Sequence, residues 1–350
     1  MFLAYFLFAA RPVPPETVLV PLWLSSFESE TPVKFNNNDY DYDNNKLIPF
    51  KLDNRFGYFD HGGNFSINRI IDKKISFSEN LWAEYDDTPD SIQVKNSSDE
   101  ITAFIENPRG YPFFMDNRTF LVSNEQNAVS GVDTAGNIIW TYEFSGILTC
   151  ADAASGLLIS GSLDGITEVL NDTGKQIFSF EPGGSRYPVI LGCAVSDDGS
   201  RMAIISGIEK QRFLLLERFG AKTGDYKVVY HEFLDNGFRR PVHITFTGNG
   251  KWIIFEQSGG LGIYETGTRQ LKKVALDGEI IAMDTCGTQG FLFTLVSGAG
   301  SKKKLVGIKL PGRVMIEMPF NGKDVFFNRC DSQLFIGGEK AIISFNLDKR

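Results

Sequence analysis

The stretch "GVDTAGNIIWTYEF" (131–144) joins two short apolar runs through a turn, and Trp140 lies in the second run. Asp133 and Gly136 are residue types that tight turns favour. An aspartate side chain can bond the nearby backbone, and glycine adopts positive φ without strain. Apolar runs on both sides of such a turn predict a β-hairpin.

The same hairpin recurs along the chain. Its copies share a strand, a turn with glycine and a second strand, and they are "LNDTGKQIFSF" (170–180), "GAKTGDYKVVY" (220–230), "YETGTRQLKKV" (264–274) and "KLPGRVMIEM" (309–318). A second kind of hairpin alternates with it, most clearly in "LGCAVSDDGSRMAIISG" (191–207) and "HITFTGNGKWIIFEQ" (243–257). Together the two hairpins make units of four short strands in about 40–45 residues.

Four-stranded units at this period are typical of a β-propeller. Seven units begin near residues 55, 112, 147, 188, 241, 280 and 324, and the last has three strands before Arg350. A ring of blades must close, because an open strand edge promotes aggregation. The sequence therefore predicts an all-β, seven-bladed propeller with four-stranded antiparallel blades, whose last blade is closed by the N-terminal strand "NNKLIPFKL" (44–52).

The chain begins with the apolar run "MFLAYFLFAARP" (1–12). The run is too short to span a bilayer, and it resembles the apolar part of a signal peptide without the preceding basic residues. We expect residues 1–30 to be a separate N-terminal segment, a truncated signal or anchor, and residues 31–350 to be one propeller domain. An exported protein, periplasmic or envelope-associated, is therefore expected. A cytoplasmic protein is the alternative if the run packs as a strand.

Charge and cysteine content argue against nucleic-acid binding and against a zinc site. The net charge of −8 argues against nucleic-acid binding, which needs a basic surface. We expect a monomer that contacts a membrane only through its N-terminus. Cysteines 150, 193, 286 and 330 form no CxxC pair, so a zinc site is not expected. They recur at a similar phase of the repeat and are expected on innermost strands as reduced thiols, with a metal-binding ring of thiols as the alternative.

The repeats resemble the blades of quinoprotein-type and WD-repeat propellers. The quinoprotein blade has a small residue, an aspartate, a glycine and a tryptophan at fixed spacing, and Gly131, Asp133, Gly136 and Trp140 match it. At the level of the repeat the chain is also similar to the propeller lipoprotein of the outer-membrane barrel-assembly machinery, which is not an enzyme. That resemblance implies a scaffold that binds a protein or peptide. The lipoprotein has eight blades and a lipid anchor, and neither is expected here.

The resemblance also raises the question of an enzyme. Quinone-dependent dehydrogenases typically have eight blades, often adjacent cysteines, and a calcium ion, whereas this chain has no Cys-Cys pair. We therefore expect no cofactor, and Trp140 is expected to pack between adjacent blades. The alternative is a propeller hydrolase or lactonase with calcium in the central channel, for which Asp60, Asp284 and Asn328 are candidate inner-strand ligands.

Two further polar features suggest chemistry less strongly. Asp39, Asp41 and Asp43 alternate, but an EF-hand-type calcium loop would need glutamate where Phe50 stands, so a polar linker is expected. His61 lies in a glycine-rich run and is expected to be a turn residue, between the first and second strands of the first blade, rather than a catalyst.

Arginines recur in the segments expected to join one blade to the next. Such loops share one face of a propeller, so these arginines predict a cationic rim that binds a carboxylate or phosphate on an acidic partner. The alternative is that each arginine stacks on a nearby aromatic ring or pairs with an acidic neighbour. The candidate rim residues are Arg55, Arg109, Tyr111, Arg186, Tyr187, Arg239 and Arg240.

Overall fold

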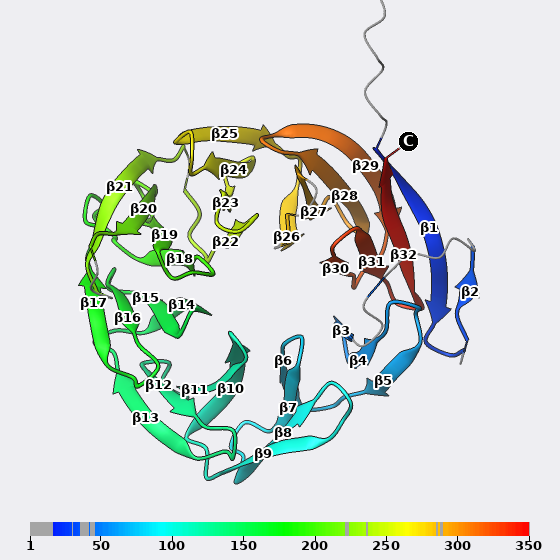
Figure 1. Ribbon diagram of the computed structural model, residues 1–350, viewed down its shortest axis with the longest axis horizontal. Helices are drawn as coiled ribbons and strands as arrows, with labels where there is room; N and C mark the ends of the chain where they lie inside the picture. Colours follow the sequence, from blue (N-terminus) through cyan, green and yellow to red (C-terminus); the bar gives the residue numbers. More distant parts are fainter. Residues whose placement is uncertain are drawn as a thin grey trace, which may run out of the picture.

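The computed structural model describes residues 17–29, 31–35, 42, 46–220, 224–235, 237–284, 286–287 and 290–349. Within that part of the chain the strands form eight sheets arranged as a ring, and each sheet runs from the centre outward (Figure 1). The predicted β-propeller with antiparallel blades is therefore confirmed. The predicted count of seven blades is wrong, because the span assigned to one unit, 55–111, contains strands of two sheets.

Six blades are four-stranded sheets that follow one another along the chain. The strands of the first three are β6 (Lys74–Phe77), β7 (Leu81–Tyr85), β8 (Ser91–Asn96), β9 (Ile101–Glu106), β10 (Gly110–Met115), β11 (Arg118–Ser123), β12 (Ala128–Val132), β13 (Ile138–Glu143), β14 (Leu148–Ala154), β15 (Leu157–Ser162), β16 (Thr167–Leu170) and β17 (Gln176–Phe180). Those of the next three are β18 (Ile190–Val195), β19 (Arg201–Ser206), β20 (Arg212–Arg218), β21 (Tyr226–Phe233), β22 (Ile244–Thr247), β23 (Trp252–Gln257), β24 (Gly260–Glu265), β25 (Gln270–Ala275), β26 (Glu279–Met283), β27 (Phe291–Ser297), β28 (Lys302–Lys309) and β29 (Arg313–Asn321).

The closing blade combines strands from both ends of the described chain. It contains β30 (Phe326–Cys330), β31 (Gln333–Gly337) and β32 (Ala341–Lys349), followed outward by β1 (Thr17–Ser26) and the short β2 (Val33–Lys34). β1 pairs antiparallel with β32 along its whole length. An N-terminal strand thus closes the ring as predicted, but that strand is β1 and not 44–52. The propeller also begins before the predicted domain boundary at residue 31.

The remaining blade has three strands among the described residues, β3 (Ile48–Leu52), β4 (Arg55–Phe59) and β5 (Phe65–Ile70). Its β4–β5 turn repeats the β12–β13 turn: the Asn64 N–H donates to the Asp60 carboxylate at 2.9 Å, as the Asn137 N–H donates to Asp133 at 2.8 Å. Because β12 and β13 are third and fourth strands, β4 and β5 hold those positions too, and β3 holds the second. Among the described residues this blade therefore has no innermost strand, which is why the repeat period did not reveal the blade.

In the part of the chain that the structure describes, no strand pairs with the edge of β3 that faces away from β4. The Ile71 N–H donates to the Asn54 carbonyl at 2.7 Å, and the alternation of antiparallel hydrogen bonds then directs the backbone of Pro49 and Lys51 away from β4. Proline has no N–H, so it is tolerated at a sheet edge and disfavours pairing with a further strand. Pro49 thus disfavours the pairing of a further strand with this edge of β3.

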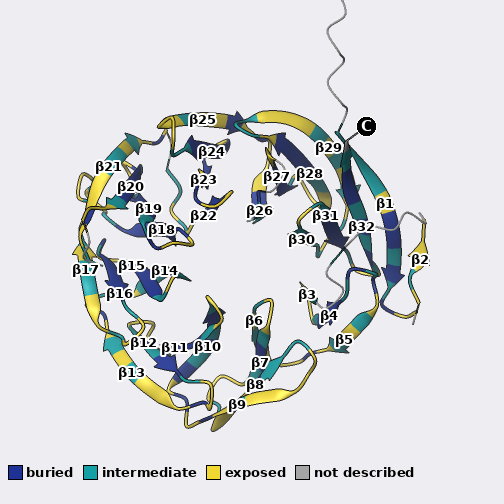
Figure 2. Ribbon diagram, viewed as in Figure 1, coloured by how far each residue is buried: buried dark blue, intermediate teal, exposed yellow. Residues whose placement is uncertain are grey.

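The hydrophobic core is divided among the interfaces between blades. In the described part of the chain each of the eight interfaces has its own cluster of buried side chains. At the closing interface, Trp23 of β1 packs with Phe50 of β3 and Phe59 of β4. Middle strands are largely buried and the outermost strands expose many residues (Figure 2). The blades therefore form a stiff scaffold whose loops and turns are free to present side chains.

Candidate partner-binding face

The two faces of the ring carry different connections. Since neighbouring strands are antiparallel, the loops that join one blade to the next lie on the same face as the turns between second and third strands. We call this the linker face. The opposite face carries the turns between first and second strands and between third and fourth strands.

All of the predicted rim arginines lie on the linker face, though not all in the predicted loops. Arg55 directly follows the β3–β4 turn instead of a blade-joining loop. Its guanidinium donates to Asn68 at 2.7 Å and lies 5.0 Å from the centre of the Phe27 ring. Arg109 is exposed in the β9–β10 loop, as predicted.

The two predicted tyrosines have different surroundings. Tyr111 is half-buried on β10, where its ring stacks on Tyr85 with centroids 6.5 Å apart, and burial raises the pKa of its hydroxyl. Tyr187 is 46% exposed in the β17–β18 loop, and the Arg186 guanidinium lies 5.5 Å from its ring centre. Arg186 is itself exposed, so this pair is open to a partner.

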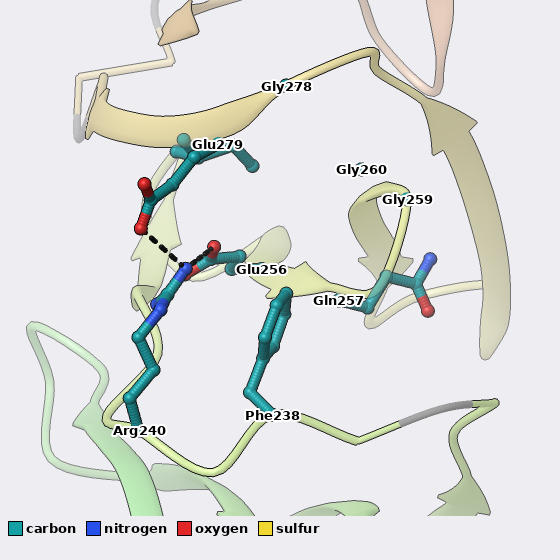
Figure 3. Close-up of a pocket in the computed structure, with 9 residues that line it drawn as sticks. Phe238, Arg240, Glu256, Gln257, Gly259, Gly260, Gly278 and Glu279 are labelled. Atoms are coloured by element: carbon teal, nitrogen blue, oxygen red, sulfur yellow. Dashed lines mark hydrogen bonds and ion pairs between the residues drawn. The ribbon is translucent and has the colours of Figure 1, made fainter. Parts of the chain in front are cut away.

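The β21–β22 loop contributes two arginines, one of which is exposed and the other bound to glutamates. Arg239 is exposed. Arg240, in contrast, is held by two glutamates. Its Nη2 donates to Glu256 Oε1 at 2.7 Å and its Nη1 donates to Glu256 Oε2 at 3.0 Å. The same Nη2 lies 3.3 Å from Glu279 Oε1 (Figure 3). The Arg240 guanidinium also lies 4.6 Å from the centre of the Phe238 ring.

The burial of Glu256 explains why it binds Arg240 through both carboxylate oxygens. Glu256 is only 2% exposed, and a buried carboxylate requires a paired cation. The bidentate hydrogen bonds to Glu256 raise the pKa of Arg240, which therefore stays charged. Glu279 is largely exposed and adds a second carboxylate, so the group as a whole has one more negative than positive charge.

A cavity of about 370 Å³ opens beside this group (Figure 3). It lies between the β22–β25 and β26–β29 blades and is lined by Phe238, Arg240, Glu256, Gln257, Gly259, Gly260, Gly278, Glu279 and Ile280. The space beside Gly259 is empty, because a Cβ added there would meet no atom within 4 Å. The volume is in the range of sites that hold a small molecule or a side chain.

A second cleft, of about 260 Å³, lies beside Arg109 on the same face. It is lined by the β11–β12 turn and by one face of β13, including Glu125, Glu143, Ser130 and Thr141. Like the first cavity, it combines one arginine from a blade-joining loop with two glutamates. The rim arginines come from four segments of the linker face, namely the start of β4 and the β9–β10, β17–β18 and β21–β22 loops.

The candidate calcium ligands are not brought together. Asp60 caps the β4–β5 turn and is not on an innermost strand. Asp284 is fully buried and pairs with the equally buried Arg329 at 2.6 Å, while Asn328 accepts from the Arg329 N–H at 2.7 Å. Among the described residues no group of three or more histidine, cysteine, aspartate or glutamate side chains is placed to hold a metal ion. Residues Asp39, Asp41 and Asp43 lie outside the described part of the chain.

The cysteines and His61 have mainly structural surroundings. None of the four cysteines forms a disulfide. Cys150, Cys193 and Cys330 lie on innermost strands, whereas Cys286 follows β26. His61 lies in a turn, as predicted, but the turn joins third and fourth strands. Its ring is buried, and its Nδ1 lies 2.5 Å from Gln333 Oε1 of the closing blade.

The residues that the sequence did not reveal are the acidic partners of Arg240. Glu256 ends the apolar run "WIIFEQ" (252–257) just before a Gly-Gly turn, and a charged residue at the end of a buried strand is the signal that could have identified it. Glu279 begins β26 in the next blade. A contact between side chains of two blades depends on where each side chain lies along its own blade, and a single sequence does not give both positions.

Of the predicted N-terminal segment, residues 1–30, the signal-like run 1–12 lies outside the described part of the chain, whereas residues 17–26 form β1. Among the residues that are described, none belongs to a helix with the length and apolar character needed to cross a lipid bilayer.

Comparison with known proteins agrees with this architecture. A protein of Treponema pallidum (strain Nichols), described as uncharacterised, is 27% identical over 288 residues, covering 80% of this chain and 74% of its own. BamB from Moraxella catarrhalis superposes with a TM-score of 0.57 at 10% identity, covering 94% of this chain and 100% of its own. The computationally designed Ika8 protein gives 0.63 at 12% identity, covering 89% and 95%. The Cps50 (Swd1) propeller domain of Myceliophteria thermophila gives 0.51 at 10% identity, covering 74% and 95%.

The likeness to solved structures at such low identity concerns the fold. A family model described as "beta-propeller protein" matches residues 1–349, nearly the whole chain. Together with the eight-bladed ring, this match shows that the chain belongs to that β-propeller family.

Proposed function

We propose that this propeller is a non-enzymatic scaffold in the cell envelope that binds a protein or peptide partner on its linker face. The observation that carries the proposal is the pair of clefts on that face. Each combines an arginine from a blade-joining loop with two glutamates and with polar or aromatic side chains. Loops held by a rigid scaffold commonly supply recognition surfaces of this kind.

The free arginines add a second element to the face. Arg109, Arg186 and Arg239 are exposed, and Tyr187 offers an exposed ring beside Arg186. These side chains suit a carboxylate or phosphate on the partner, whereas Arg55 and Arg240 are held by neighbouring groups. An envelope location is supported by the repeat-level resemblance to the propeller lipoprotein of the barrel-assembly machinery.

Replacing Arg109 and Arg186 together with alanine tests the proposal. The tagged variant should retain much less partner protein than the wild type when purified from its own cells under mild conditions, without a lower melting temperature. A matched control is the double variant Arg269→Ala/Arg313→Ala, which removes the same charge from exposed positions on the opposite face. Equal retention by both double variants would contradict the proposal. A stoichiometric calcium ion in the purified protein would favour the hydrolase instead.

A further inference from the structure

The cavity at Arg240 suggests which chemical group the partner places there. We infer that this cavity binds a basic side chain, arginine or lysine, of the partner. The inference deepens the proposed function and rests on it, because it names the group recognised at one point of the linker face. It also reverses the sequence-based expectation for Arg240, which placed this residue in a rim that binds anions.

The charge of the cavity wall is the first argument. Both carboxylate oxygens of Glu256 accept hydrogen bonds from Arg240, so this pair is satisfied within the protein. Glu279 Oε1 lies 3.3 Å from Nη2 of the same guanidinium, no hydrogen bond joins these two side chains within the described part of the chain, and the Glu279 side chain is 62% exposed. The Glu279 carboxylate therefore keeps acceptor capacity on the side of the cavity. A second cation can bind it without displacing Arg240 from Glu256.

A buried amide supplies the second argument. Gln257 lines the cavity and is only 5% exposed. Its Nε2 donates to the Leu261 carbonyl at 3.0 Å, while its Oε1 accepts no hydrogen bond from the described residues. Unused acceptors of nearly buried side chains normally find a donor, and a guanidinium or ammonium group brings several.

The shape of the cavity is compatible with such a group. Figure 3 shows Phe238 between Arg240 and Gln257. Gly259, Gly260 and Gly278 lie across the opening from the Phe238 ring. An aromatic ring beside acceptor oxygens favours cations, since the face of the ring carries negative charge. The net charge of −8 on the whole chain adds a long-range attraction for a basic partner.

The test uses the full-length protein and a defined probe, the peptide acetyl-Gly-Arg-Gly-amide. Binding is followed by saturation-transfer NMR, which detects millimolar affinities, and is compared with the citrulline peptide, a neutral molecule of nearly the same shape. We expect the arginine peptide to bind at least about fivefold more tightly than the citrulline peptide. A lysine peptide in place of arginine shows which of the two basic groups the cavity prefers. Equal binding of the arginine and citrulline peptides would overturn the inference.

Variants locate the binding. Glu279→Gln should weaken binding of the arginine peptide at least about fivefold, and Glu279→Lys should abolish it, since an added ammonium group repels the probe. Glu317→Gln is the matched control. Glu317 on β29 is also exposed and pairs with one cation, Lys304 on β28, at 2.9 Å. Unchanged affinity in Glu279→Gln, or an equal loss in Glu317→Gln, would overturn the inference. Retention of the partner by the linker face in cells would still stand in that case, so the two proposals fail separately.

Discussion

The indole Nε1 of Trp23 donates a hydrogen bond to the carbonyl oxygen of His61 at 2.8 Å, and this contact ties the last blade to the first. The same hydrogen bond, at 2.9 Å, joins the Trp140 indole to the Asp172 carbonyl oxygen between two consecutive blades elsewhere in the ring. In both pairs the tryptophan lies on a fourth strand and the carbonyl lies in the third-to-fourth turn of the next blade. The ring is therefore closed by a contact that the chain also uses between consecutive blades.

Trp23→Phe tests the importance of the closing contact. The variant removes the N–H donor and part of the buried ring, and we expect a loss of about 1–2 kcal/mol in the free energy of unfolding. Urea denaturation followed by circular dichroism measures it. Trp140→Phe is the comparison within the ring. If Trp140→Phe destabilises the protein and Trp23→Phe does not, the closing interface does not depend on this contact.

Each of these tryptophans packs against a turn glycine, and substitution separates packing from backbone strain. Gly174 and Gly156 have nearly the same φ, +74° and +76°. A Cβ at Gly174 would lie 2.4 Å from the Trp140 ring, whereas a Cβ at Gly156 would meet nothing within 4 Å. Gly174→Ala should therefore lower stability by about 1–3 kcal/mol more than Gly156→Ala. Equal melting temperatures for the two variants would show that the indole can move aside at little cost.

The missed blade shows what repeat analysis could and could not provide. The period depends on two hairpins per unit, and the described residues of the β3–β5 blade include no innermost strand and therefore no first hairpin. The run "DHGGN" (60–64) matches "DTAGN" (133–137) at the aspartate, the second glycine and the asparagine, so comparing turn with turn would have placed His61 correctly. Pro49 also marks β3 as an edge strand, because its backbone has no N–H to donate.

The buried pair Asp284–Arg329 should be important for stability. Both side chains are fully buried and their closest N–O distance is 2.6 Å, so removing one partner leaves an uncompensated charge. We expect Asp284→Ala to cost about 3–5 kcal/mol. The double variant Asp284→Ala/Arg329→Met should lose less than the sum of the two single variants in a double-mutant cycle. Strict additivity of the three values would argue against a direct interaction.

Asp152 should make stability depend on pH in the opposite direction to a salt-bridged carboxylate. Burial raises the pKa of Asp152 above its usual value. A raised carboxyl pKa in the folded state means that stability decreases as the pH rises from about 3.9 toward the folded-state pKa, and the loss persists at pH 7. Asp152→Asn removes the charge and keeps an oxygen for the Val195 N–H, which bonds Asp152 at 2.9 Å.

The Asp152→Asn variant should therefore melt at a higher temperature than the wild type at pH 7, and the difference should shrink as the pH is lowered toward about 4. Asp197→Asn is the control, because Asp197 is exposed on the same face and its loss changes the net charge equally. A gain in Asp197→Asn of the same size would assign the effect to overall charge rather than to burial. Scanning calorimetry at several pH values makes the comparison.

The candidate site was predictable in part. The phase of the repeat placed Arg109, Arg186 and Arg239 in exposed blade-joining loops, because loop positions follow directly from strand order. It did not reveal that Arg240 is neutralised, since Glu256 and Glu279 come from different strands and meet it only in the folded ring. Local sequence determines which face a loop occupies, while the charge of a site depends on residues that neighbouring blades contribute.

The most direct test of partner binding on the linker face is site-specific photo-cross-linking in the cells that make the protein. The photoreactive residue p-benzoylphenylalanine replaces Tyr187, which is exposed on the linker face, or Asn249, which is exposed on the opposite face. We expect irradiation to give a discrete cross-linked partner from position 187, lost in the Arg109→Ala/Arg186→Ala background, and none from position 249. Cross-links from position 249 alone, or a product at 187 that persists in the double variant, would contradict the account.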